Sequence, residues 1–100
     1  MATVAKQLAR TAAATSLTTL YTTPAATTTI VTNIAVTNTA STAATFTINL
    51  NSIALFTTST IAANSTAFID LKQVLSATQI INGLASAVTV NFHISGVELS

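Results

Sequence analysis

The sequence has little of several residue types on which common protein functions depend. Its 100 residues include no cysteine, one proline, two glycines, five aromatic residues and five charged residues. The absence of cysteine excludes a disulfide framework, thiolate chemistry and a cysteine zinc site. Two glycines, Gly83 and Gly96, are too few for a phosphate-binding loop. A formal net charge of +1 provides no basic patch of the kind that nucleic-acid binding requires.

Long apolar runs are also missing. The longest strictly apolar run, residues 53–56, has four residues. A membrane-spanning helix needs roughly 18 or more. We therefore expect no transmembrane span and no membrane partner.

Side chains that perform chemistry are equally scarce. His93 is the only histidine, and one histidine cannot form a histidine-rich metal site. Asp70 and Glu98 are the only carboxylates, and they lie near the ends of different predicted strands, so we expect ion pairs with Lys72 or Arg10 rather than a catalytic pair in one cleft. The serines have no set of base and acid partners. We expect no enzyme, no catalytic residue, no metal ligand and no cofactor.

Apolar residues and threonine dominate what is present. Half of the residues are apolar and 22 are threonine. This composition is too apolar for a disordered chain, and the length suits one domain with a modest core. It is also too poor in charge for a typical free monomer. We therefore hypothesise that other subunits cover much of the surface, as in a homo-oligomer or a larger assembly.

The pattern along the chain predicts short β-strands. Pro24 separates two of them, residues 17–23 and 30–37. Side chains of a strand alternate between two faces. In the second strand the better core face comprises Ile30, Thr32, Ile34 and Val36.

Five further stretches read as strands, namely residues 44–50, 53–57, 66–71, 79–82 and 87–99. Turns are predicted at residues 38–41, 51–52 and 61–65, a loop at 57–60, and a turn at Asn82-Gly83. Residues 72–75 are expected to form one helical turn or a bulged crossing.

The inward face of the strand at residues 44–50 is predicted to comprise Ala44, Phe46, Ile48 and Leu50. In the last strand the predicted inward residues are Val88, Val90, Phe92 and Ile94, with His93 on the outer face and a bulge at Gly96 before Val97 and Leu99. Seven or eight short strands indicate an all-β fold, an antiparallel β-sandwich spanning residues 16–100.

Residues 1–15 differ from the rest and are predicted to form an N-terminal arm. They contain two of the three basic residues and no acid. Four-residue spacings allow a short helix with Thr3 as its cap. We expect the arm to dock on a neighbouring subunit; a frayed tail and a targeting peptide are the alternatives. The predicted interface residues of the arm are Val4, Lys6, Leu8 and Arg10.

A resemblance covers residues 15–99. The segment LTTLYTTPAATTTIVTNIAVTNTASTAATFTI, the later IAANSTAFID and the closing ISGVEL are similar to a recurring pattern in small bacteriophage virion proteins. Thr23 stands where that pattern has valine, and Thr37-Asn38 where it often has Cys-Asn. Neither difference affects the expected fold.

The resemblance implies an immunoglobulin-like or jelly-roll β-sandwich that is built into the virion as a structural protein. It names no catalytic residue. The expected function is a capsid decoration or cement protein that binds the major capsid protein or other virion subunits. The alternatives are a neck, collar or tail component, and a receptor- or glycan-binding fibre module, which would need an exposed aromatic platform.

Overall fold

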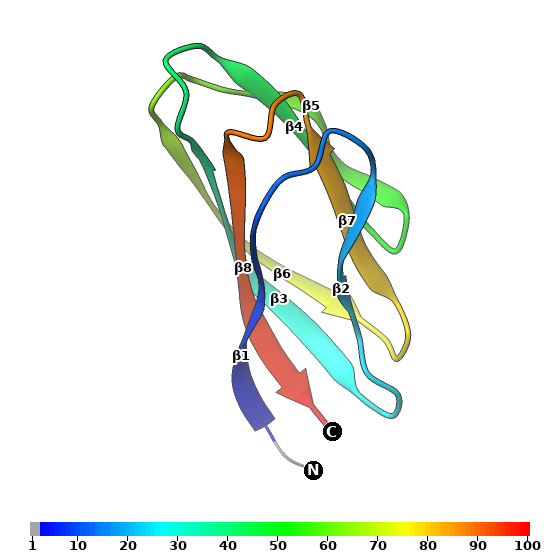
Figure 1. Ribbon diagram of the computed structural model, residues 1–100. Coiled ribbons are helices and arrows are strands. Elements are labelled where there is room, and N and C mark those ends of the chain that lie inside the picture. The colour runs from blue at the N-terminus through cyan, green and yellow to red at the C-terminus, as the bar shows by residue number, and fades with distance from the viewer. Residues whose placement is uncertain (1–2) are drawn as a thin grey trace.

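The computed structural model describes residues 3–100, and these form eight β-strands and no helix (Figure 1). The all-β prediction is confirmed. The strands are β1 (Thr3–Ala12), β2 (Thr18–Thr22), β3 (Thr28–Asn38), β4 (Ala44–Leu50), β5 (Ile53–Ile61), β6 (Thr66–Leu75), β7 (Ile80–Ala85) and β8 (Val90–Leu99).

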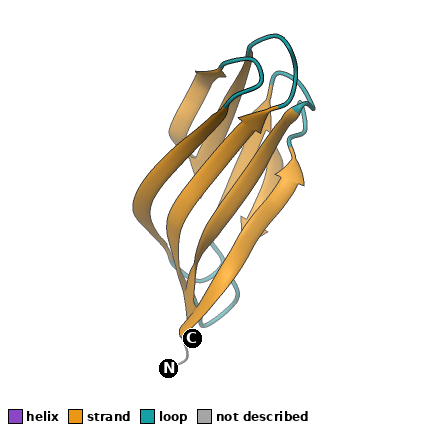
Figure 2. Ribbon diagram, turned by 90° about the vertical axis from the view of Figure 1, so that its left-hand side faces the viewer, coloured by secondary structure: helices purple, strands orange, loops and turns teal. Residues whose placement is uncertain are grey.

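The strands form two antiparallel sheets of four. Sheet A has the order β1-β8-β3-β6, and sheet B has the order β2-β7-β4-β5. In Figure 2 the strands of sheet A lie side by side and curve along their length. One hydrophobic core takes residues from both sheets. The arrangement is compatible with the predicted antiparallel β-sandwich.

The strand pairs are nested within one another along the chain. β4 pairs with β5, β3 with β6, β2 with β7, and β1 with β8. Two further pairings, β3 with β8 and β4 with β7, join these pairs into the two sheets. Because the outermost pair places Thr3 opposite Leu99, the two ends of the chain lie side by side (Figure 1).

The innermost pair is a hairpin with a two-residue turn. Asn51 and Ser52 both have positive φ, 51° and 64°, which is the geometry of the primed turns that match the twist of a hairpin. The turn predicted at residues 51–52 is therefore confirmed.

The core is built from alternating residues on facing strands. Ile48 in β4 and Phe92 and Ile94 in β8 are fully buried, as predicted. The ring of Phe46 lies 5.9 Å from that of Phe56 and 6.4 Å from that of Phe92, measured between centroids. These distances are typical of aromatic pairs in a packed interior.

A row of bulges crosses sheet A. Leu8 is the extra residue in β1 opposite β8, and Thr32 is the extra residue in β3 opposite β8. β6 has its own irregularity opposite Thr32. Gly96 lies at this level, where a Cβ atom would be only 2.3 Å from the Ile30 carbonyl oxygen. The two strands thus approach more closely at this level than a side chain on Gly96 would allow.

The bulge at Thr32 corrects the predicted core face of β3. Ile34 and Val36 are fully buried, as expected, but Val31 is buried in place of Ile30. A bulge adds one residue to the strand, so the side chains before it point to the opposite face from the one that strict alternation predicts. Thr32 itself is exposed.

Three local predictions are wrong. The polar run at residues 57–60 belongs to β5, which continues through a register shift beside Thr58, whose φ is 46°. Asn82-Gly83 lies inside β7, because Gly83 lets the Thr47 carbonyl approach to 2.7 Å from the place of a Cβ. Val88 lies in the turn before β8 and is exposed.

Of the two structures expected at residues 72–75, a helical turn or a bulged crossing, the bulged one is found, since β6 runs on to Leu75.

The short helix that the residue spacing allowed near the N-terminus does not form. Residues Thr3–Ala12 form strand β1, which pairs with β8 along its length. Helical spacing of a few apolar residues is a weak signal, whereas the free edge of β8 offers a full row of backbone partners. The predicted boundary at residue 15 falls in the connection between β1 and β2.

Candidate functional site

Charge is divided unequally between the two sheets. Every lysine, arginine, aspartate and glutamate, together with His93, lies on β1, β6 or β8, which belong to sheet A. The four strands of sheet B carry no charged residue. The two faces of the molecule therefore differ in the partners that they can bind.

The outer face of sheet B is a surface of uncharged hydrogen-bonding groups. Thr45 lies opposite Thr60, and Asn49 lies opposite Asn82. Thr60 is exposed, Thr45 and Asn49 are half-buried, and Asn82 is buried. The half-buried Leu84, opposite Thr47, lies on the same face. Cross-strand threonine and amide pairs present donors and acceptors without repulsion between identical copies.

The edge of sheet B formed by β5 is also exposed. Natural sheets blunt their edges with charge, proline or short strands. β1 and β6 carry charged residues, and β2 is a five-residue strand followed shortly by Pro24. β5 has nine residues and no charge or proline, and its Ile53 is 72% exposed. Only the register shifts in β5 interrupt this edge.

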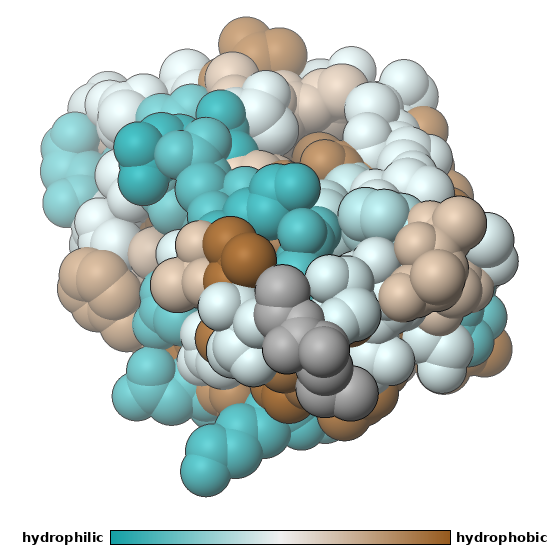
Figure 3. Space-filling view, turned by 90° about the horizontal axis from the view of Figure 1, so that it is seen from below, coloured by the Kyte–Doolittle hydropathy of each residue, from teal (hydrophilic) through white to brown (hydrophobic). Residues whose placement is uncertain are grey.

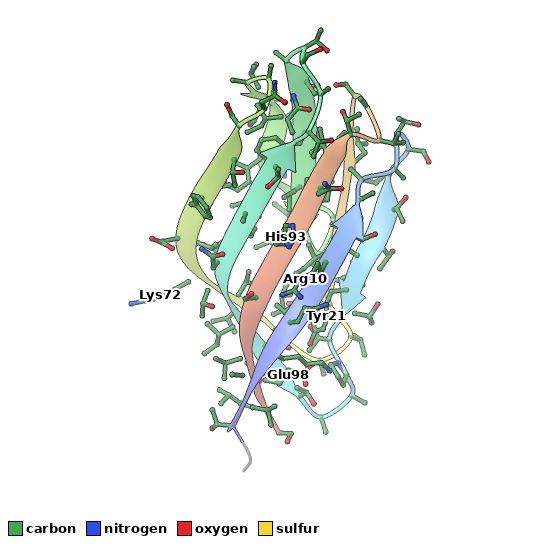
Figure 4. All side chains as sticks on the ribbon, turned by 60° about the vertical axis from the view of Figure 1, so that its left-hand side comes forward. Arg10, Tyr21, Lys72, His93 and Glu98 are labelled. Atoms are coloured by element: carbon green, nitrogen blue, oxygen red, sulfur yellow. The ribbon has the colours of Figure 1, made fainter. Side chains whose placement is uncertain are left out.

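The structure places the four predicted interface residues in different surroundings. Leu8 is buried at 6% exposure in the core of its own chain, and Val4 is 50% exposed. The Lys6 Nζ lies 3.3 Å from Glu98 Oε2. Arg10 is exposed on the outer face of sheet A, opposite His93 (Figure 4). The expectation that these residues contact a neighbouring subunit stays a prediction.

A cluster of polar side chains joins the two sheets at the end where the chain termini lie. Tyr21 of β2 donates a hydrogen bond to the Glu98 carboxylate of β8, and its hydroxyl lies 2.8 Å from Thr29 Oγ1 of β3. Lys6 of β1 completes the cluster through its ion pair with Glu98. The Glu98 carboxylate thus links β8 with β1 and β2, and the Tyr21 hydroxyl adds β3. Figure 4 shows the positions of Tyr21 and Glu98.

The cluster shifts the ionisation of its members. The hydrogen bond from Tyr21 lowers the pKa of Glu98 below its ordinary value of 4.5, and Lys6 acts in the same direction against partial desolvation. Burial raises the pKa of Tyr21 above 10.0, and the negative charge of Glu98 adds to this. At neutral pH the pair therefore consists of a phenol donor and a carboxylate acceptor.

The ion pairs predicted from the sequence have other partners. Glu98 pairs with Lys6 and not with Lys72 or Arg10. Asp70 accepts a hydrogen bond of 3.2 Å from Asn33 on the outer face of sheet A. Glu98 points to the opposite face, so the two carboxylates are separated by the sheet.

Sequence reasoning missed the cluster because it expected a bulge at Gly96. β8 in fact alternates without interruption, which turns Gly96 and Glu98 inward and Val97 and Leu99 outward. The bulges lie in β1, opposite Ile94 and Ser95, and in β3, opposite Ser95 and Gly96. The signal was present, since Glu98 continues the inward positions of Phe92 and Ile94 at a period of two.

His93 lies on the outer face of β8, as predicted, and is half-buried. Among residues 3–100, no three His, Asp or Glu side chains gather into a group that could hold a metal ion. Within the same residues there is no helix long and apolar enough to cross a membrane. Seen from the end with the termini, residues of intermediate hydropathy separate small hydrophobic and hydrophilic patches (Figure 3).

Comparison with models of protein families, with curated proteins and with solved structures gives no match for this chain.

Proposed function

We propose that this chain is a non-enzymatic structural protein of a bacteriophage virion, namely a capsid decoration or cement protein that binds and stabilises the head shell. The observation that carries the proposal is sheet B, four strands without a charge whose outer face presents threonine and asparagine. Such a face suits close contact with other subunits, because it provides hydrogen bonds without burying charge.

The strand pairing supports the jelly-roll type over the immunoglobulin-like type. In a jelly roll, one long nested hairpin is rolled into two sheets, so successive strands alternate between them. Here β4–β5 is the only consecutive pair that shares a sheet. The immunoglobulin-like sandwich instead places several consecutive strands side by side in one sheet. Jelly rolls occur among viral capsid proteins and lectins, and this analogy of fold raises the expectation of a capsid role.

The protein would stabilise the head shell by binding to its assembled form. A protein that binds only the assembled shell lowers the free energy of that state, and many copies act together. The uncharged face of sheet B would lie against the shell. From the edge strand β1, the half-exposed Val4 would add an apolar contact with a neighbouring subunit, whereas Arg10 lies on the outer face of sheet A, away from the shell.

The other two virion roles differ in copy number and surface chemistry. A neck, collar or tail component would use the same sandwich at a few copies per particle. A receptor- or glycan-binding fibre module would need an aromatic platform. Phe68, at 76% exposure, is the one aromatic residue of the described chain that is exposed, so it has no aromatic neighbour on the surface with which to form such a platform.

The stoichiometry of this chain against the major shell protein tests the proposal directly. Quantitative mass spectrometry of purified particles that incorporate the chain should give a ratio near one to one, or one to a few, for a cement protein. A ratio of a few per cent would assign it to the neck or tail. Absence from the particles would refute the virion role.

A matched pair of lysine variants tests the role of sheet B. Thr60→Lys places a charge on its outer face and should abolish incorporation into particles, because the charge would lose its hydration at the contact. Thr66→Lys places the same charge on an exposed position of β6 in sheet A and should be incorporated normally. Equal incorporation of both folded variants would contradict the assignment of sheet B as the shell contact.

A further inference from the structure

Four cross-strand rows run over the outer face of sheet A, which no other part of residues 3–100 covers. The outermost row, Ala12, Asn91, Thr37 and Thr66, is uncharged, and the other three are named here upper, middle and lower. Each row crosses β1, β8, β3 and β6 in that order. The upper row is Arg10, His93, Ala35 and Phe68; the middle row is Gln7, Ser95, Asn33 and Asp70; the lower row is Ala5, Val97, Ile30 and Val74.

Opposite charges occupy the two edges of this face. Arg10 lies on the β1 edge and makes no ion pair within the described chain. Asp70 lies on the β6 edge and bonds only to the neutral amide of Asn33. Lys72, two residues further along β6, points off the edge of the sheet and not across its face (Figure 4). The face thus carries Arg10 at its β1 edge and an apolar lower row, and at its β6 edge it carries Asp70, with Lys72 directed away from the face.

We propose that this face binds the same face of a second copy, with the two-fold axis parallel to the strands and between β8 and β3. Such an axis places β1 of each copy over β6 of the other. The inference goes beyond the proposed function, since it concerns the isolated chain and does not depend on any particle.

Each row is complementary to itself under this symmetry. In the upper row Arg10 lies over Phe68 of the second copy, an exposed ring suited to a cation–π contact. In the middle row Gln7 meets Asp70, and Ser95 meets Asn33. In the lower row Val97 meets Ile30. Arg10 also has the length to reach Asp70 in the next row, and because the interface is isologous every contact occurs twice.

The alternative two-fold axis, across the strands, lacks this complementarity. It would place each strand over its own copy, so that at any level of the axis the two β1 edges with Arg10 lie together and the two β6 edges with Asp70 lie together. Like charges in direct opposition suppress an association. Charge complementarity therefore selects the axis along the strands.

The size of the face indicates a weak dimer. Four strands of about ten residues offer a face of roughly 30 by 15 Å. Two such faces bury about 1,000 Å², near the lower bound for a specific interface. We therefore expect dissociation constants in the micromolar range, and aligned packing of the two sheets at an angle of about 30°.

Charge-swap variants measured by sedimentation equilibrium test the dimer. Arg10→Asp or Asp70→Arg alone should weaken the dimer at least about tenfold in Kd, because each places like charges together twice. The double variant Arg10→Asp/Asp70→Arg restores both pairs with the net charge of the natural chain and should return Kd to within about threefold of the natural value. Thr60→Asp adds one negative charge on the outer face of sheet B, half the change made by Arg10→Asp, and should leave Kd unchanged.

Three outcomes would overturn the proposal. The natural chain could remain monomeric up to millimolar concentration. The single variants could dimerise as well as the natural chain. The double variant could dimerise no better than either single variant, which would exclude the axis along the strands. Circular dichroism of each variant confirms that the fold is retained, and neither variant site is buried. Because no particle is involved, failure of the dimer would leave the virion proposal intact.

Discussion

At the scale of single residues, the cluster around Glu98 is the place where charge enters the interior of the sandwich. One carboxylate accepts hydrogen bonds from Tyr21 and Lys6 and thereby joins strands of both sheets. A charge near the interior is tolerated when its acceptor sites are filled in this way. Thr23 is also buried here, and its hydroxyl has no hydrogen-bond partner in the described chain. The Glu98 carboxylate therefore has its hydrogen-bond partners, whereas the Thr23 hydroxyl has none.

The first prediction concerns pH. Because the pKa of Glu98 is lower in the folded chain, its contribution to stability is present above the ordinary value of 4.5 and is lost as pH falls through the folded value. Because the pKa of Tyr21 is raised, its contribution is present below 10.0 and is lost as pH rises through the folded value. Thermal unfolding followed by circular dichroism should therefore show losses of Tm in acid and in strong alkali.

Two substitutions separate these effects. Glu98→Gln should remove the acid loss and Tyr21→Phe the alkaline loss, each at a cost of about 1–3 kcal/mol at neutral pH because a charge-assisted hydrogen bond disappears. Asp70→Asn is the matched control, since it removes the other carboxylate. If Asp70→Asn and not Glu98→Gln removed the acid loss, the cluster would not be its source.

At the scale of elements, β1 is the strand whose role differs most from its description as an arm. It supplies Leu8 and Ala9 to the core and pairs with β8 over most of its length. At its bulge, Leu8 packs against Gly96, where a Cβ atom would lie 2.9 Å from Leu8 Cδ1. β1 is therefore a structural part of the sandwich as well as an edge available to partners.

The second prediction compares two substitutions in β1. Leu8→Ala should cost about 2–4 kcal/mol of unfolding free energy, because it leaves a cavity in a packed core. Val4→Ala, at a half-exposed position of the same strand, should cost no more than about 0.5–1 kcal/mol. Urea denaturation measures both. Equal and small effects would indicate that β1 is held loosely, as expected of an arm.

The sequence predicted strands well where alternation was uninterrupted and poorly where a bulge changed its phase. Residues 44–50 match β4, and Ile34, Val36, Phe92 and Ile94 are buried as expected. Ile30 was assigned to the wrong face, and a bulge was expected at Gly96 that β8 does not have, because a bulge depends on the neighbouring strand, which local pattern does not reveal. The polar residues 57–60 became strand because pairing with β4 outweighs their weak apolar signal.

At the scale of the whole molecule, composition predicted the fold class but not that the charged residues all lie on strands of sheet A. Twenty-two threonines and short alternating runs already indicated an all-β chain. The pairing of distant strands then decided which sheet receives each charge, and local sequence carries no information on such pairing. Both interaction surfaces proposed above, the uncharged face of sheet B and the self-complementary face of sheet A, result from this division.

The nested pairing has a kinetic consequence. The loop that must close is two residues for β4–β5 and nearly the whole chain for β1–β8. Closure entropy rises with loop length, but each inner pair brings the next pair together once it has formed. Folding should therefore start at the hairpin of Asn51 and Ser52 and proceed outward, with β1 joining last.

Substitution of glycine into the Asn51-Ser52 turn tests this order of strand pairing during folding. Ser52→Gly relieves a positive φ of 64° and should stabilise the chain by about 1 kcal/mol. The gain should appear as folding about fivefold faster, with unfolding nearly unchanged, because the turn is already formed in the transition state. Thr78→Gly relieves a φ of 70° between β6 and β7, outside the first hairpin, and should instead slow unfolding. Stopped-flow kinetics distinguish the two cases, and the reverse pattern would mean that the sandwich assembles from its ends.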